Sequence, residues 1–163
     1  MIGTRDDGEN LRSGHAGKEK HGTVGKHRQH MHTPKNMGKT SNERACTVLI
    51  IGGGFGGLMS GARFHEAGIK DVHVIEAGGD FGGTWYWNRY PGAQCDIESY
   101  CYLPLLEELD YMPKEKYSFA PEIYEHSQRI AEAYNLYENA IFQPKVTEMR
   151  WLEADASWLV TTD

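Results

Sequence analysis

The stretch that decides the fold is Thr47-Val48-Leu49-Ile50-Ile51 followed at once by Gly52-Gly53-Gly54-Phe55-Gly56-Gly57. Its first half is an unbroken apolar run rich in β-branched residues, which is typical of a parallel strand buried on both faces. Its second half places Gly52, Gly54 and Gly57 at the spacing Gly-x-Gly-x-x-Gly, with Phe55 inside the same loop. A strand that runs into such a loop predicts a nucleotide-binding turn.

Each glycine of this spacing has a mechanical role when the loop joins a strand to a helix. Gly52 permits the tight turn, Gly54 lets the backbone approach a pyrophosphate, and Gly57 lets the helix pack closely on the strand. The pyrophosphate then meets free N–H groups at the positive end of the helix dipole. Glu76, nineteen positions after Gly57, ends the next expected strand, where its carboxylate can accept both hydroxyl hydrogens of an adenosine ribose. A dinucleotide is therefore expected, and the glycines alone do not separate FAD from NAD.

The remaining elements follow from periodicity and punctuation. Helical spacing from Leu58 to Ala67 predicts a helix that Gly68 ends, and Asp71–Glu76 predicts the second strand of a βαβ unit. The later expectations are a helix, a brief parallel strand and an antiparallel pair, at Pro121 to about Asn135, Ala140–Phe142, and Val146–Trp151 with Trp158–Thr162. The predicted fold class is α/β, a Rossmann-like βαβ unit with an antiparallel β-hairpin.

Residues 1–44 differ in composition from the rest of the chain. Their few apolar residues follow no period, which predicts a disordered polar leader ahead of a folded domain at 45–163. Of the 17 Lys/Arg and 23 Asp/Glu, the leader holds nine and five, so residues 45–163 hold eight and eighteen. A body with a net charge of about minus ten argues against nucleic acid as a partner.

Two patterns in the leader resemble ligand sites without the full motif. Five histidines could gather a metal, but no carboxylate or Cys stands at a fixed offset, so we expect no metal site there: His15, His21, His27, His30 and His32. Gly38-Lys39-Thr40 resembles the end of a P-loop but lacks the preceding glycine and strand.

Other features bear on location. No apolar run is long enough to span a membrane, and no signal-peptide core follows the start. The cysteines are odd in number and form no C-x-x-C pair, at Cys46, Cys95 and Cys101. A reduced, cytoplasmic protein is expected.

A long segment after Glu76 carries large flat side chains on a bendable backbone. It reads Gly82-Gly83-Thr84-Trp85-Tyr86-Trp87-Asn88-Arg89-Tyr90-Pro91-Gly92-Ala93-Gln94-Cys95-Asp96-Ile97-Glu98-Ser99. Such a segment can pack over a planar ring system, and its length predicts a functional loop. The alternative for Trp85 and Trp87 individually is core packing.

From about Cys46 to Asp163 the sequence resembles the flavin-dependent Baeyer–Villiger monooxygenases, the cyclohexanone and phenylacetone monooxygenase group. The resemblance covers the Gly-x-Gly-x-x-Gly loop, the aromatic segment and the Cys-Asp-Ile-Glu-Ser that follows. It implies that the dinucleotide is FAD, with Glu76 at its ribose. The flavin would be lined by Thr84, Trp85, Tyr86 and Trp87, and Gly83 is expected to bind the cofactor as well.

The resemblance assigns further residues. It places Asp96 and Tyr102 in contact with FAD, Gln94, Cys95 and Asp96 near NADPH, and the backbone of Val146 at the adenine. It also makes Asp96 the active-site carboxylate, which orients an arginine. The implied reaction inserts one oxygen atom of O2 next to a ketone carbonyl through a C4a-peroxyflavin formed on FAD.

Several family features are missing from this sequence. They are the arginine that Asp96 would orient, the second glycine-rich loop that binds NADPH, and the Phe-x-Gly-x-x-x-His-x-x-x-Trp fingerprint. We therefore expect the FAD-binding domain to be incomplete at its carboxyl end, and the isolated chain to aggregate or bind FAD weakly. Two alternatives stay open: a flavin monooxygenase that oxidises nitrogen or sulfur, and a non-catalytic nucleotide-binding module. The sequence does not fix the substrate or the oligomeric state.

Overall fold

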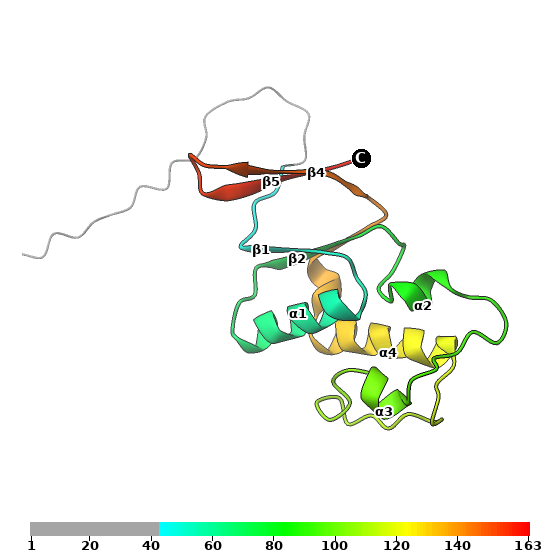
Figure 1. Ribbon diagram of the computed structural model, residues 1–163. Helices are drawn as coiled ribbons and strands as arrows, with labels where there is room; N and C mark the ends of the chain where they lie inside the picture. The colour runs from blue at the N-terminus through cyan, green and yellow to red at the C-terminus, as the bar shows by residue number, and fades with distance from the viewer. Residues whose placement is uncertain (1–42) are drawn as a thin grey trace, which may run out of the picture. The chain divides into compact units, whose positions relative to one another are not determined.

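The computed structural model describes residues 43–163 (Figure 1). Glu43 and Arg44 have no regular structure. The rest of the predicted leader lies outside the described residues. That part includes the five histidines for which no metal site is expected and the incomplete P-loop at Gly38-Lys39-Thr40.

A three-stranded parallel sheet lies at the centre of the fold and joins strands from both halves of this region. β1 (Val48–Ile51) pairs with β2 (Val72–Glu76), which pairs in turn with β3 (Ala140–Phe142), in the order β1-β2-β3. The register sets Ile51 against Ile75 and Glu76 against Phe142, so the carboxyl ends of all three strands meet at one edge. The predicted strands, including the brief one at Ala140–Phe142, are confirmed.

Two long helices cover one face of the sheet. α1 (Phe55–Glu66) and α4 (Ala120–Ala133) lie side by side below it in Figure 1. The core between them and the sheet consists of apolar side chains that are at most 8% exposed: Leu58, Ala62, Val74, Phe81, Leu105, Ile130, Ala131 and Leu136. Burial of this face supplies the main stabilisation of the unit.

The ends of both helices agree with their sequence signals. Gly68, two residues beyond α1, has φ +80°, a conformation that favours glycine. Pro121 stands in the first turn of α4, as predicted. α4 ends two residues earlier than expected, because Asn135 adopts φ +54° and its N–H bonds to the Glu132 carbonyl.

Three single-turn helices were not predicted. α2 (Thr84–Trp87) lies inside the aromatic segment, α3 (Ser99–Tyr102) begins at the last residue of that segment, and the 3₁₀ turn η1 (Leu136–Asn139) follows α4. One turn is too short to show helical periodicity, and tertiary contacts decide its conformation.

The chain ends in a two-stranded antiparallel hairpin. β4 (Val146–Leu152) pairs with β5 (Ser157–Thr162) across a turn at 153–156. The prediction of an antiparallel pair is confirmed. The register contains one irregularity between Val146 and Glu148.

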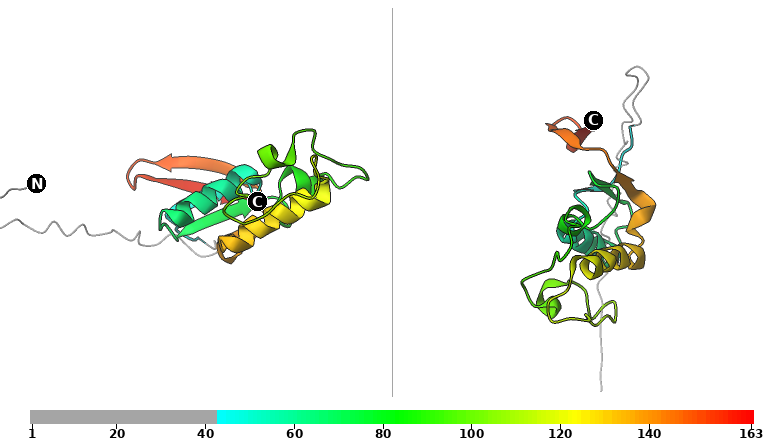
Figure 2. Two further views of the ribbon diagram at one scale, coloured as in Figure 1. Left: turned by 90° about the horizontal axis from the view of Figure 1, so that it is seen from below. Right: turned by 90° about the vertical axis from the view of Figure 1, so that its right-hand side faces the viewer.

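The views in Figure 2 show the sheet and its helices from below and from the side. Within residues 43–163, β1 has a strand partner on one side only, and Ile51 is 47% exposed. No helix in this region is both long and apolar enough to cross a membrane.

Candidate functional site: a glycine cradle at the carboxyl ends of β1 and β2

The turn between β1 and α1 closes tightly around Gly52 and Gly57. Gly52 has φ +101°, and its N–H donates to the Ile75 carbonyl at 2.8 Å. A Cβ at Gly57 would lie 1.9 Å from the Gly52 carbonyl oxygen and 3.3 Å from Ile50 Cγ2. Only glycine fits at position 57, so α1 starts directly against the end of β1.

The carboxylate of Glu76 fixes this turn to the next one. Its Oε2 accepts the N–H of Gly53 and its Oε1 accepts the N–H of Gly78, both at 2.5 Å. Glu76 is only 6% exposed, and these two charge-assisted bonds compensate for its burial. Each carboxylate oxygen keeps a second lone pair that can accept a ligand hydroxyl.

A second pair of glycines lies against the first loop. The N–H of Gly82 donates to the Gly53 carbonyl at 2.9 Å. A Cβ on Gly83 would stand 2.8 Å from Gly54 Cα, and Gly83 has φ +51°. We call the surface formed by Gly52, Gly53, Gly54, Gly82 and Gly83 the glycine cradle. Gly52, Gly54 and Gly83 are partly exposed and present backbone, as close approach of a ligand requires, whereas Gly53 and Gly82 are buried against Phe81 and Tyr124.

Trp85 and Tyr102 connect the aromatic segment to the start of α1. The indole N–H of Trp85 donates to the Tyr102 hydroxyl at 2.9 Å. The Tyr102 ring meets Phe55 edge to face, with centroids 5.6 Å apart. Trp85 is 9% exposed and packs with Ala93, Cys95, Leu103 and Ile123. The core-packing alternative thus describes Trp85, which contributes its side chain to the interior.

Tyr86, Trp87 and Thr84 lie on the outer side of the same turn. The Tyr86 side chain packs against Gly78 and Gly79, where an added Cβ would lie 2.9 Å from the ring and 2.8 Å from the hydroxyl oxygen. The Arg89 guanidinium lies 4.4 Å from the centre of this ring, and its Nε donates to the Tyr86 carbonyl. Trp87 is 61% exposed, and Thr84 is exposed as well.

Gln94, Cys95 and Asp96 alternate like a strand. Cys95 N–H donates to the Ser118 carbonyl, and the Ala93 carbonyl accepts from Ala120 N–H, so this stretch runs antiparallel to residues 118–120. Cys95 is buried, whereas Gln94 and Asp96 are exposed. Gln94 and Asp96 can therefore meet a ligand through their side chains, but the Cys95 thiol points into the core.

Val146 is the first residue of β4, where it pairs with Thr162. Its contacts are those of the hairpin. Within residues 43–163, no group of three His, Cys, Asp or Glu side chains is placed to hold a metal ion.

Comparison with known proteins identifies the relatives of this stretch. A family model described as an NAD(P)-binding Rossmann-like domain matches residues 50–110. Pentalenolactone D synthase of Streptomyces arenae is 57% identical over 117 residues, which cover 71% of this chain and 20% of that protein. Baeyer-Villiger monooxygenase 4 of Dietzia sp. (strain D5) is 55% identical over 116 residues, covering 71% and 19%.

This stretch of the chain is homologous to Baeyer–Villiger monooxygenases.

Solved structures of this family share the fold described above. The polycyclic ketone monooxygenase of Thermothelomyces thermophila superposes with a TM-score of 0.73 and 42% identity, over 77% of this chain and 20% of that one. OTEMO, in a crystal structure with FAD and NADP, gives a TM-score of 0.67 and 37% identity over 74% and 23%. The chain spans about a fifth of the length of the Baeyer–Villiger relatives that it matches.

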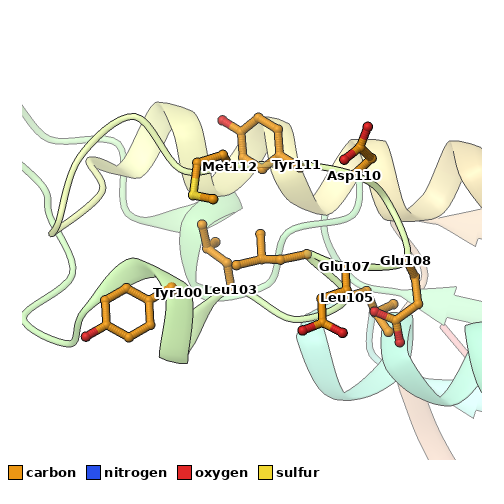
Figure 3. Close-up of a pocket in the computed structure, with 9 residues that line it drawn as sticks. Tyr100, Leu103, Leu105, Glu107, Glu108, Asp110, Tyr111 and Met112 are labelled. Atoms are coloured by element: carbon orange, nitrogen blue, oxygen red, sulfur yellow. The ribbon is translucent and has the colours of Figure 1, made fainter.

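A cleft formed by residues 100–112 contains none of the cradle glycines. Figure 3 shows this cleft of about 610 Å³, whose lining residues all come from 100–112. Leucines and three carboxylates line it, the carboxylates being Glu107, Glu108 and Asp110. None of the residues predicted for the Baeyer–Villiger site lies in it, so the candidate site is the glycine cradle.

The structure reveals one further carboxylate that the sequence does not single out. Asp80, between Glu76 and the second glycine pair, gathers hydrogen bonds from α4 and η1. Nothing in the sequence around it distinguishes this carboxylate from a solvated one, because its partners stand 44 to 57 residues later.

Proposed function

We propose that residues 45–163 bind FAD and form the flavin-binding part of an FAD- and NADPH-dependent monooxygenase. The reaction would insert one oxygen atom of O2 next to the carbonyl of a small-molecule ketone. The observation that carries the proposal is the glycine cradle closed by the Glu76 carboxylate, at the carboxyl ends of β1 and β2.

The residues of the cradle fit an adenine dinucleotide. The first amides of α1 have no intrahelical acceptor, and they face the turn where Gly52 and Gly54 leave the backbone bare. Glu76 keeps two lone pairs for the ribose hydroxyls while its amide bonds hold it in place. A 2′-phosphate at this carboxylate would be repelled, which favours FAD over NADPH in the cradle.

The aromatic segment supports a flavin beyond the cradle. Thr84 directly follows Gly83 of the cradle, and Tyr86 and Trp87 stand on the same turn with Trp87 exposed. We assign these residues to the isoalloxazine side of FAD, with Tyr102 and Trp85 behind them as support. Bound FAD supplies the redox chemistry; the chain supplies orientation and shielding.

Asp96 is the proposed catalytic residue. Its carboxylate is exposed beside the aromatic segment, where it can hold an arginine of another segment bidentately. Gln94 and the backbone of Cys95 are assigned to NADPH, and Val146 to the adenine of FAD. With NADPH as reductant and an odd number of cysteines, we place the protein in the cytoplasm.

A segment exchange tests the proposal. Residues 45–163 replace the matching segment of the polycyclic ketone monooxygenase, which is 42% identical. We expect a yellow chimera that consumes NADPH and converts a ketone to an ester. Asp96→Asn should retain the flavin and lower kcat by about a hundredfold, a typical loss for a catalytic carboxylate.

The alternatives give different results. A chimera that binds FAD but oxidises amines or sulfides and leaves ketones unchanged would favour the nitrogen- or sulfur-oxidising group. A chimera with FAD and no oxygenation of any substrate would favour the non-catalytic module, and one without FAD would refute the proposal.

A further inference from the structure

The Asp80 carboxylate is the meeting point of three segments. Oδ1 accepts the N–H of Phe81 at 2.7 Å and the hydroxyl of Tyr137 at 2.8 Å. Oδ2 accepts the hydroxyl of Tyr124 at 2.6 Å and the Nε2 amide of Gln128 at 2.8 Å. All four in-plane acceptor positions of the carboxylate are thus occupied, by donors from its own turn, from α4 and from η1.

The Tyr124 ring carries this anchoring to the glycine cradle. A Cβ on Gly82 would lie 2.7 Å from Tyr124 Cδ2, so the ring packs directly on that glycine. Gly82 has φ +131°, and its N–H donates to the Gly53 carbonyl. Gly53 belongs to the Gly-x-Gly-x-x-Gly loop at 52–57, which we call the phosphate loop. The same tyrosine ring lies 6.2 Å from Tyr86 and 5.2 Å from the Arg89 guanidinium.

Phe81 anchors the other side of the turn. It is fully buried, and its ring meets Tyr137 and Phe142 edge to face at 5.0 Å and 5.1 Å. Packing therefore holds Phe81, the residue before Gly82 and Gly83, and hydrogen bonds hold Asp80, the residue before Phe81. The turn has little freedom to move away from Gly53 and Gly54.

The charges agree with this geometry. Burial alone would raise the pKa of Asp80, but the bonds from Tyr124, Gln128 and Tyr137 outweigh it and hold the pKa below its usual value. Burial and the Asp80 carboxylate raise the pKa of Tyr124 to about 12. At neutral pH the pair is a carboxylate facing neutral hydroxyl donors, which is the strong form of the contact.

We propose that Asp80 is a positioning residue for the cofactor, which holds the second glycine turn and the aromatic segment at a fixed distance from the phosphate loop through Tyr124. This inference rests on the proposed FAD site. It assigns a function to a carboxylate whose side chain bonds to none of the five cradle glycines and that no spacing rule singles out.

The test uses the whole chain and four variants. Asp80→Ala removes all acceptors, whereas Asp80→Asn keeps one, and the Tyr124 hydroxyl and the Gln128 amide can reorient toward its NH2 group. Tyr124→Phe removes one bond. The matched control is Tyr134→Phe, which removes a tyrosine hydroxyl bond to Glu66 at 3.0 Å, away from the cradle.

The first readout is amide hydrogen exchange without FAD. We expect exchange in residues 79–88 to be about tenfold faster in Asp80→Ala, intermediate in Asp80→Asn, and unchanged in Tyr134→Phe. The second is FAD titration, with Kd raised about tenfold in Asp80→Ala and about threefold in Tyr124→Phe. Visible circular dichroism of the bound flavin at saturation should change in both.

Unchanged exchange in residues 79–88 would overturn the inference. So would a lower Tm with unaltered flavin dichroism, since that marks a purely structural role. If Asp80→Ala does not fold, Asp80→Asn and Tyr124→Phe decide by the same readouts. Failure of the wild-type chain to bind FAD, with the exchange pattern as expected, contradicts the proposed function and reduces Asp80 to a loop-ordering residue, which also overturns the inference.

Discussion

Gly57 and Gly56 are neighbours in α1 with opposite surroundings. An added Cβ at Gly57 would meet the Gly52 carbonyl oxygen at 1.9 Å, whereas one at Gly56 would meet nothing within 4 Å. Because the obstructing atoms at Gly57 are backbone, a side-chain rotamer cannot relieve the contact. The two positions therefore separate the packing requirement from the general cost of glycine in a helix.

We expect Gly57→Ala to lower the free energy of unfolding by about 3 kcal/mol, as overpacking against backbone does. Gly56→Ala should be neutral or raise it by up to about 1 kcal/mol, since alanine is the better helix former. Urea unfolding followed by circular dichroism measures both. Equal stability of the two variants would show that α1 does not pack on the turn as described.

The tryptophans of the aromatic segment show where prediction from sequence stops. Trp85 and Trp87 lie two residues apart, yet Trp85 is buried with Tyr102 and Trp87 is 61% exposed. The segment has neither helical nor strand periodicity over a useful length, so the sequence cannot tell which indole faces inward. That choice depends on α4 and α3, which approach from elsewhere in the chain.

Among the elements, α4 contains a buried histidine with both ring nitrogens in use. Arg129 can only donate, so its 3.1 Å contact makes Nδ1 of His126 the acceptor, and Nε2 must carry the proton that it donates to the Pro104 carbonyl at 2.7 Å. The ring stacks on Tyr111 at 5.3 Å. The neutral ring thus fastens the stretch from Pro104 to Tyr111 onto α4.

Burial, reinforced by Arg129, lowers the pKa of His126 below its ordinary value of about 6.5. A lowered pKa means that the unfolded chain binds the proton more readily. The contribution of neutral His126 to the free energy of unfolding is therefore complete above about pH 6.5. It is lost as the pH falls toward the lowered pKa of His126 in the folded chain. We expect the free energy of unfolding to decrease between about pH 7 and pH 5, and His126→Gln to flatten this dependence.

The carboxylates with lowered pKa, such as Asp80 and Glu122, lose their contributions only below about pH 4, so the two effects occupy separate windows. Denaturant titrations at half-unit steps of pH measure the part of the pH dependence of the free energy of unfolding that comes from His126. A slope between pH 7 and pH 5 that is the same in wild type and His126→Gln would contradict it.

The long elements were predictable and the short connections were not. Periodicity, capping residues or β-branched composition within the elements themselves indicate the strands β1 and β2, the helices α1 and α4, and the hairpin. The pairing of Gln94 with Phe119 and the anchoring of Asp80 to α4 join residues 25 and 44 to 48 positions apart, and no local pattern encodes them. The glycine cradle was half predicted: the spacing shows its first loop, and the contact of Gly83 with Gly54 needs the fold.

For the molecule as a whole, the hairpin presents an apolar surface. Met149 and Trp151 on β4 face Val160 and Trp158 on β5, and Met149, Trp151 and Trp158 are 50%, 44% and 58% exposed. A two-stranded ribbon with such a face is prone to pair with other chains. This observation supports the expectation that the isolated chain self-associates.

We expect Trp158→Lys to shift the chain toward the monomer in sedimentation velocity at increasing protein concentration. Ser157→Lys is the matched control, because it adds the same charge at the adjacent residue without removing an apolar side chain. Self-association that persists unchanged in Trp158→Lys would locate the contact elsewhere, for example at β1, which has one strand partner in the described region.

The central claim is that this chain holds FAD in the glycine cradle with Glu76 at the ribose. A calorimetric titration of FAD into wild type and Glu76→Gln tests it most directly, because an amide replaces one of the two oxygens that accept from Gly53 and Gly78. We predict weak binding that saturates at one FAD per chain, and a Kd raised about tenfold or more in Glu76→Gln. Equal FAD affinity of the two proteins, or no FAD bound by either, would contradict the account.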